Sequence, residues 1–151
     1  MTAQEKEEKR ENFVAWVTFI EDRVDEWKAG LPESISSKLT YKIDSLDVIE
    51  SYFLANFTRD SIKDVANKYA IDAFASYIGE TLRLHWPNAK WVIELDDKDS
   101  VDFNTPVIKV PVGSGIPPYA LVRRVLLENR GNYLTHFYHL RLGFINDPGT
   151  L

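Results

Sequence analysis

The sequence predicts an α+β fold, with elements in the order α-α-α-β-β-α-α and one small antiparallel sheet. Apolar residues recur at helical spacing over most of the chain, two short stretches alternate as strands do, and neither an internal repeat nor a low-complexity linker interrupts them. A length of 151 residues fits one domain. We therefore expect a single helix-rich domain over residues 1–151, with residues 1–10 frayed and residues 146–151 as a tail.

Three helices are expected before the sheet. Apolar side chains spaced three and four residues apart predict helices over residues 3–28, 45–57 and 61–85. The stretch between the first two, residues 31–43, is expected to be a loop. Glycine and proline supply the stops after the first and third helices. The third helix opens with a sequence resembling a capping box, in which Ser61 would be the capping residue.

Two strands and two further helices complete the expected order. Residues 90–95 and 106–112 alternate between apolar and polar side chains, and an acidic loop joins them as a long hairpin. Two prolines then set the first turn of a helix over residues 118–130, which Gly131 is expected to end. A last helix is expected over residues 132–142. This order is typical of an α+β domain with helices covering a small sheet.

Gly79 lies in the middle of the third expected helix, where glycine costs about 1 kcal/mol relative to alanine. It shares a helical stripe with Leu82 and Trp86. Close approach of another group is the usual physical reason for such a glycine. We predict that the backbone of another element or a Trp ring packs against Gly79.

Glu80 and Arg83 follow this glycine and are three residues apart, so they can pair on the helix surface. At the rim of a pocket, the same two side chains could instead orient a polar ligand. Trp86 and Trp91 flank the next turn, and the sequence leaves open whether they are buried or exposed. Glu80, Arg83 and Trp91 are therefore candidate ligand-binding residues.

The sequence Gly113-Ser114-Gly115 lies between the second strand and the following helix, a position where phosphates often bind. Two prolines remove backbone donors there, and no nucleotide-binding glycine motif is present. Arg123, one turn into the helix, could reach an anion at this loop. Ser114 and Arg123 are thus candidates for binding an anion or a phosphorylated ligand. The alternative is a glycine-rich turn with solvated arginines.

His136 and His139 are three residues apart in the last expected helix. Zinc takes three or four ligands, which here would have to include His85 or carboxylates. The helical zinc motif places its histidines four apart, with a Glu between them, and is not present. The acidic loop also lacks the turn glycine and distal Glu of a calcium loop. We expect no metal, and His136 is kept as a candidate ligand-binding residue.

Composition narrows the classes of function. The chain has no cysteine, which excludes disulfides, thiolate catalysis and Cys-based zinc sites. A net charge of −5 with dispersed basic residues disfavours nucleic-acid binding. The first residues are charged and lack the apolar core of a signal peptide, and no apolar run approaches a membrane span. The expectation is a cytoplasmic protein without membrane contact.

The run from Tyr77 to Arg83, Y-I-G-E-x-L-R in pattern, is followed by Trp91 and later by Pro118 with Val122-Arg123. Together these residues resemble an uncharacterised bacterial domain family, and the resemblance covers about residues 40–140. It implies one intact bacterial domain. It supplies neither a catalytic residue nor a cofactor.

The leading functional hypothesis is a non-catalytic protein that binds another protein, in an immunity-like or regulatory role, or binds itself as a homodimer. An acidic domain with 13% aromatic residues and no catalytic motif favours it. The alternative is a small-molecule or anion-binding domain, or a small enzyme, with a pocket at Glu80, Arg83 and Arg123. No cofactor is expected. Convergence of those side chains in a deep pocket would favour the ligand hypothesis, and a flat exposed apolar patch would favour the protein hypothesis.

Overall fold

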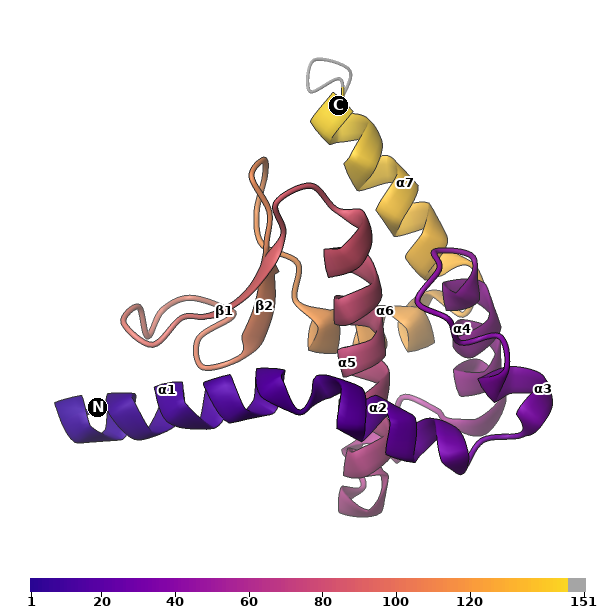
Figure 1. The fold of residues 1–151 in the computed structure, drawn as a ribbon, viewed down its shortest axis with the longest axis horizontal. Helices are drawn as coiled ribbons and strands as arrows, with labels where there is room; N and C mark the ends of the chain where they lie inside the picture. Colours follow the sequence, from indigo (N-terminus) through magenta and orange to yellow (C-terminus); the bar gives the residue numbers. More distant parts are fainter. Residues whose placement is uncertain (147–151) are drawn as a thin grey trace.

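The central helix, α5, runs through the middle of the molecule, and the other elements surround it (Figure 1). The protein is described by a computed structural model that covers the backbone of residues 1–146 and the side chains of residues 1–142. Its helices are α1 (Ala3–Thr18), α2 (Ile20–Ala29), α3 (Glu33–Ser36), α4 (Ser45–Asn56), α5 (Lys68–His85), α6 (Pro118–Glu128) and α7 (Tyr133–Asn146). Helices α2 and α6 pack against α5, and α4 packs against α7.

The sheet is a two-stranded antiparallel hairpin, as the sequence predicted. Strand β1 (Lys90–Ile93) pairs with β2 (Pro106–Lys109), with Trp91 opposite Ile108. Ile108 also forms a bridge to Ile116, which anchors the segment leading into α6. Because helices dominate and the sheet is small and antiparallel, the α+β class is confirmed.

The hydrophobic core centres on α5. Residues 73–79 and 81–82 of this helix are buried, and Phe74, Tyr77 and Ile78 are completely so. Neighbours cover α5 on most sides, and small side chains such as Ala73 and Ala75 let them approach closely. Among residues 1–146, no helix combines the length and apolar character that are needed to cross a bilayer.

A buried carboxylate fastens α7 to α4. Glu50 is fully buried, and its two oxygens accept hydrogen bonds of 2.8 Å from the backbone N–H groups of Tyr133 and Leu134. Burial raises the pKa of Glu50, although these hydrogen bonds oppose the shift. The contact satisfies the first amides of α7 and sets the position of the helix that contributes Arg141 to the cleft described below.

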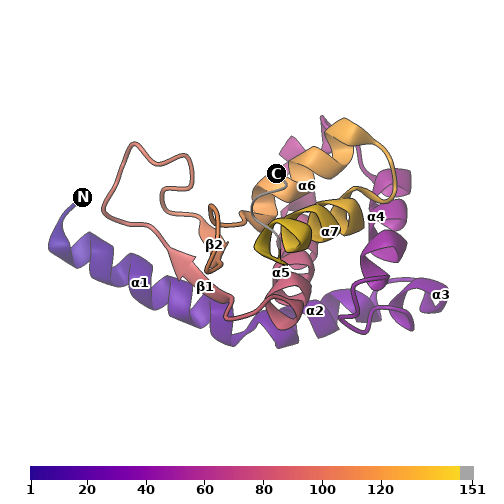
Figure 2. The same ribbon diagram turned by 90° about the horizontal axis from the view of Figure 1, so that it is seen from above.

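The first predicted helix is two helices in the structure. They meet at Phe19, whose backbone (φ −100°, ψ 18°) leaves the helical region, and the Thr18 hydroxyl bonds to the carbonyl of Val14 at 2.7 Å. Helix α2 turns to bury Ile20 and Val24 against the core, whereas α1 leaves the body (Figures 1 and 2). The segment expected to be frayed, residues 1–10, instead contains a helix start capped by Thr2 and Glu5.

Other boundaries also differ from the prediction. The expected loop contains the short helix α3, and residues 61–67 form two 3-10 turns, η1 (Ser61–Lys63) and η2 (Val65–Asn67), before α5 begins. Ser61 bonds back to Thr58, so its side chain favours a local turn over a helix cap. Helix α6 ends at a left-handed Asn129 (φ 51°) rather than at Gly131.

Helix α7 does not close at Gly143 as expected but continues to Asn146. Residue 146, where the tail was expected to begin, is thus the last residue of α7, and the rest of the expected tail, residues 147–151, lies outside the described part of the chain.

Candidate functional site

One face of α5 carries a row of polar side chains, Asp72, Ser76, Glu80 and Arg83, with Gly79 beside them. Steps of three and four residues place them along one side of the helix. Ser76 contacts α2, Glu80 contacts β1, and Asp72 contacts α6. The row therefore lies where four elements meet, with Ser76 fully buried between them.

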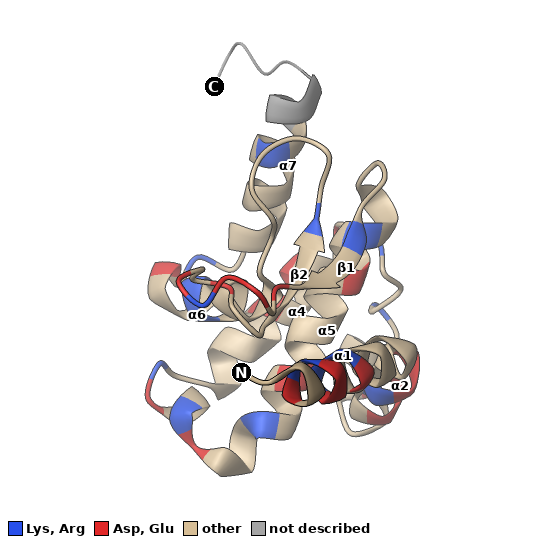
Figure 3. Cartoon of the chain, turned by 90° about the vertical axis from the view of Figure 1, so that its left-hand side faces the viewer, with Lys and Arg blue, Asp and Glu red and all other residues tan. Residues whose placement is uncertain are grey.

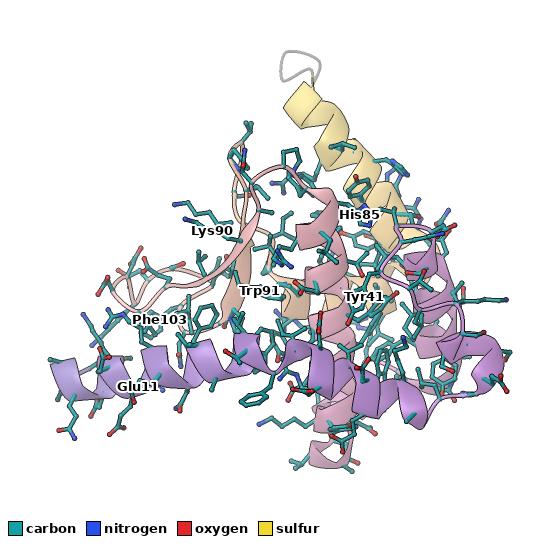
Figure 4. All side chains as sticks on the ribbon, in the orientation of Figure 1. Glu11, Tyr41, His85, Lys90, Trp91 and Phe103 are labelled. Carbon is teal, nitrogen blue, oxygen red and sulfur yellow. The ribbon has the colours of Figure 1, made fainter. Side chains whose placement is uncertain are left out.

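The C-terminal end of the row is closed. Glu80 accepts hydrogen bonds from the Nε and Nη2 atoms of Arg83, the latter at 3.1 Å, and from Nε1 of Trp91 at 3.3 Å. The Glu80 side chain is only 13% exposed. The hydrogen bond between Glu80 and Arg83 raises the pKa of Arg83. The predicted Glu80–Arg83 pair is present, and Trp91 joins it. Figure 4 labels Trp91 on β1.

The Trp91 ring explains Gly79. A Cβ atom at this position would overlap the ring carbons Cη2 and Cζ2 of Trp91 and would lie 3.0 Å from Cγ of Pro118. The predicted close packing of a Trp ring against Gly79 is confirmed. The helix accepts a poor helix former because it brings β1 and α6 against α5.

Trp16 from α1 and Arg23 from α2 pack over the middle of the row. The Trp16 ring meets the edge of Trp91 with centroids 5.0 Å apart, and the Arg23 guanidinium lies 4.5 Å from the Trp16 ring centroid. Arg23 donates to the Ser76 hydroxyl at 3.0 and 3.1 Å and to the Trp16 carbonyl at 3.1 Å. Burial lowers the pKa of Arg23.

Tyr119 and Asp72 form the N-terminal end of the row. The Tyr119 hydroxyl donates to Oδ1 of Asp72 at 2.9 Å, and the Ser76 hydroxyl donates to the Asp72 carbonyl at 2.6 Å. Burial raises the pKa of Tyr119, and the neighbouring Asp72 carboxylate raises it further. Tyr119 therefore stays protonated and acts as a donor near neutral pH.

This end of the row borders an open cleft of about 850 Å³. The volume falls within the ~300–1,000 Å³ range of small-molecule sites. The floor contains Trp16, Asp72 and Tyr119, and the loop between the strands forms one margin. The charged and aromatic side chains that complete the lining are Lys68, Asp102, Arg123, Phe137 and Arg141.

Arg141 reaches the cleft from α7. Its Nη2 donates to the Ser114 carbonyl at 2.7 Å, and its guanidinium lies 5.7 Å from the Phe137 ring centroid and 6.0 Å from that of Trp86. Burial lowers the pKa of Arg141. The Gly-Ser-Gly turn thus supplies a carbonyl that positions an arginine, while Gly115 has no room for a Cβ atom beside Val107.

The structure distributes the six predicted site residues over three places. Glu80, Arg83 and Trp91 form the closed cluster, and Ser114 and Arg123 line the cleft. His136 is exposed on α7 and is not among the residues that line the cleft. The sequence prediction missed Asp72, Ser76 and Tyr119, although the four-residue steps from Asp72 to Glu80 were a readable signal.

Within the described residues, no group of three or more His, Cys, Asp or Glu side chains is arranged to hold a metal ion. No protein-family model matches the sequence, and neither a curated protein nor a solved structure matches the chain. The resemblance to a bacterial domain family therefore stays a prediction, and the cleft is the feature of the molecule that points to a function.

Proposed function

We propose that this protein binds a small organic anion with a planar apolar part in the cleft bordered by Trp16, Tyr119 and Arg141. One observation carries the proposal: aromatic rings and cationic side chains line the same cleft, over a floor of polar groups that already have partners. This is the alternative hypothesis from the sequence, moved from Glu80 and Arg83 to the cleft beside them.

The apolar part of the ligand would contact the aromatic side chains. Trp16, Tyr119 and Phe137 come from α1, α6 and α7, and their rings offer flat apolar surface. Trp16 is held by Trp91 on one side and by Arg23 on another, so its ring is already positioned before a ligand enters. A positioned ring reduces the entropy lost on binding.

The charge of the ligand follows from the lining. Lys68, Arg123 and Arg141 contribute three cations against two carboxylates, those of Asp72 and Asp102, and Asp72 already accepts a hydrogen bond from Tyr119. Arg141 lines the cleft and donates one hydrogen bond to Ser114 among the described residues, and a guanidinium has five N–H donors, so further donors remain for a ligand. A carboxylate or sulfonate would use them bidentately.

Binding of another protein, the leading hypothesis from the sequence, has weaker support. The large apolar side chains that are exposed in the described chain, such as Val14, Val65, Leu84 and Leu140, lie on different elements. Single exposed apolar side chains are common on protein surfaces and do not by themselves indicate a docking face. A protein partner, including a second copy of the chain, stays a prediction.

Calorimetric titration with 2-naphthoate and with neutral 2-naphthamide tests the proposal. The two probes share the ring and differ in charge, so we expect only naphthoate to bind well. Arg141→Gln should weaken naphthoate binding, because it removes the cation held at Ser114. Arg130→Gln is the matched control, since Arg130 is exposed at the end of α6 and does not line the cleft. Equal binding of both probes, or equal effects of both variants, would contradict the proposal.

A further inference from the structure

A second hollow, of about 680 Å³, lies between residues 59–63 and α6. We call it the basic groove. Its apolar lining is Ile62, Ala120 and Leu127, and Leu127 is 50% exposed. Ala120 and Arg123 border both the basic groove and the cleft, so the two hollows adjoin across α6.

The groove concentrates positive charge in an acidic protein. Arg59, Lys63, Arg123 and Arg124 line it against the single carboxylate of Asp60, although the chain carries a net charge of −5. Arg124 pairs with Glu128 at 2.8 Å. Among the described side chains, Arg59, Lys63 and Arg123 form no ion pair. Three exposed cations over an apolar lining favour an occupant that combines negative charge with an apolar side chain.

The loop at residues 96–102 of the same chain has this chemistry. The loop carries Asp97, Asp99 and Asp102 with a single lysine, Lys98, and its Val101 is 95% exposed. The turn is shaped by hydrogen bonds from the backbone N–H groups of Asp99 and Ser100 to Asp97. An exposed Val flanked by carboxylates is costly to leave in water and is matched by the lining of the groove.

The acidic loop and the basic groove lie on the same side of the molecule. Figures 2 and 3 show the loop and α6 on the side away from α2. Val101 and Asp102 stand on one margin of the cleft, and Arg123 stands on the margin next to the groove. A two-fold axis through this face would therefore bring each loop toward the groove of the other copy.

We propose that two copies of this chain form a symmetric dimer, in which the 96–102 loop of each copy occupies the basic groove of the other. Val101 contacts Ile62 and Leu127, and the loop aspartates face Arg59 and Lys63. Such an interface is isologous, because loop and groove meet twice around the axis. Its area is small and its pairs are exposed, so the dimer is held largely by charge and weakens with salt.

The groove favours a second copy over a nucleic acid. No aromatic side chain is among its lining residues, so unpaired bases would find no stacking surface there. The chain as a whole carries a net charge of −5, which disfavours binding of a polyanion. An acidic protein loop with an apolar tip matches both the positive charge and the apolar lining of the groove.

Sedimentation equilibrium of the full chain tests the dimer. We expect a dimer in about 0.01 M salt and a monomer in about 1 M salt, where the Debye length falls from about 30 Å to about 3 Å. The paired change Arg59→Glu with Lys63→Glu should weaken association on the order of tenfold or more, and so should Asp97→Lys with Asp99→Lys. Lys38→Glu, an exposed change between α3 and α4, should leave association unchanged.

Mixing the two paired variants gives the sharpest result. In a reciprocal dimer, the reversed groove of one variant attracts the reversed loop of the other, and the unreversed groove and loop also attract, so the mixture should form a heterodimer. Circular dichroism of each variant checks that it is folded. A wild-type monomer at low salt, a dimer insensitive to either change, or a mixture that stays monomeric would each overturn the proposal.

Discussion

The two ends of the polar row on α5 use similar side chains for different purposes. At the closed end, Glu80 is 13% exposed and all its hydrogen bonds go to Arg83 and Trp91. At the open end, Asp72 bonds to Tyr119 on the margin of an 850 Å³ cleft. The charged residues nearest the unusual glycine therefore hold the fold together, and the surface available to a ligand lies two helical turns away.

The difference arises from what covers each end. Trp91 comes from β1 and fills the space above Gly79, whereas the segment above Asp72 is the edge of α1 and the loop between the strands. A ring in van der Waals contact excludes a ligand, and an open margin admits one. Three substitutions and one pH series separate the two ends, beginning with the largest expected effect.

Gly79→Leu should destabilise the closed end most, on the order of 1–3 kcal/mol or more, because the side chain would overlap the Trp91 ring and force β1 from α5. Urea unfolding followed by circular dichroism measures this loss. Gly30→Ala is the control glycine, since its Cβ would meet only the Trp27 carbonyl at 3.5 Å. If the two variants unfolded at the same urea concentration, the ring would not be packed as described.

Glu80→Gln should lower stability by about 1–2 kcal/mol, because it removes a charge-assisted pair with Arg83 that is mostly shielded from water. Naphthoate binding should not change. The matched control is Glu128→Gln, which breaks the more exposed pair with Arg124 and should have no measurable effect on stability. A loss of ligand affinity in Glu80→Gln would contradict the separation of the two ends and would mean that both belong to one binding site.

Tyr119→Phe should cost about 0.5–1.5 kcal/mol of stability and weaken naphthoate binding, because it leaves the Asp72 carboxylate unpaired beside an anionic ligand. Tyr138→Phe removes a comparable hydroxyl, which bonds to the His85 carbonyl at 3.2 Å outside the cleft lining. Calorimetry of both variants should show lost affinity only in the first. Unchanged binding in Tyr119→Phe would show that the hydrogen bond between Tyr119 and Asp72 does not contribute to ligand binding.

The smallest effect concerns alkaline pH. Burial raises the pKa of Tyr119 above its ordinary 10.0, so the folded chain keeps this proton to higher pH than the unfolded chain. Its contribution to stability is therefore complete below about pH 10 and is lost as pH rises through the folded pKa. Tyr119→Phe should lose less stability than wild type between neutral pH and pH values above 10. If the free energy of unfolding fell equally with pH in the two proteins, Tyr119 would not be buried and protonated as described.

The sequence predicted the parts of the fold that depend on local pattern. Apolar periodicity located α4, α5 and α6, alternation located the two strands, and the cost of a helical glycine correctly required a close neighbour at Gly79. The break at Phe19 was not predictable in this way, because hydrogen bonds from Phe19 to Ala15 and from Arg23 to Phe19 keep the pattern helical across it. The bend follows from the packing of α2 on α5, which is a tertiary contact that local sequence does not reveal.

The candidate site was harder to predict because its contacts join distant parts of the chain. Asp72 and Tyr119 are 47 residues apart, and Ser114 and Arg141 are 27 apart. The local sequence pattern does not predict that α6 and α7 bring these side chains to one cleft. His136 was selected for its residue type, and its exposed position on α7 follows from the faces that α4 and α6 cover.

Helix α1 buries none of its residues, whereas α5 is buried along most of its length. In native-state hydrogen exchange, amides report the free energy of the smallest opening that exposes them, and segments with few buried contacts open first. The amides of residues 7–18 should therefore exchange through detachment of α1 alone, long before those of α5. Each such opening lifts Trp16 from Trp91 and uncovers Arg23, so the floor of the cleft comes apart at a rate set by α1, which packs on the core only through partly buried side chains such as Trp16 and Val17.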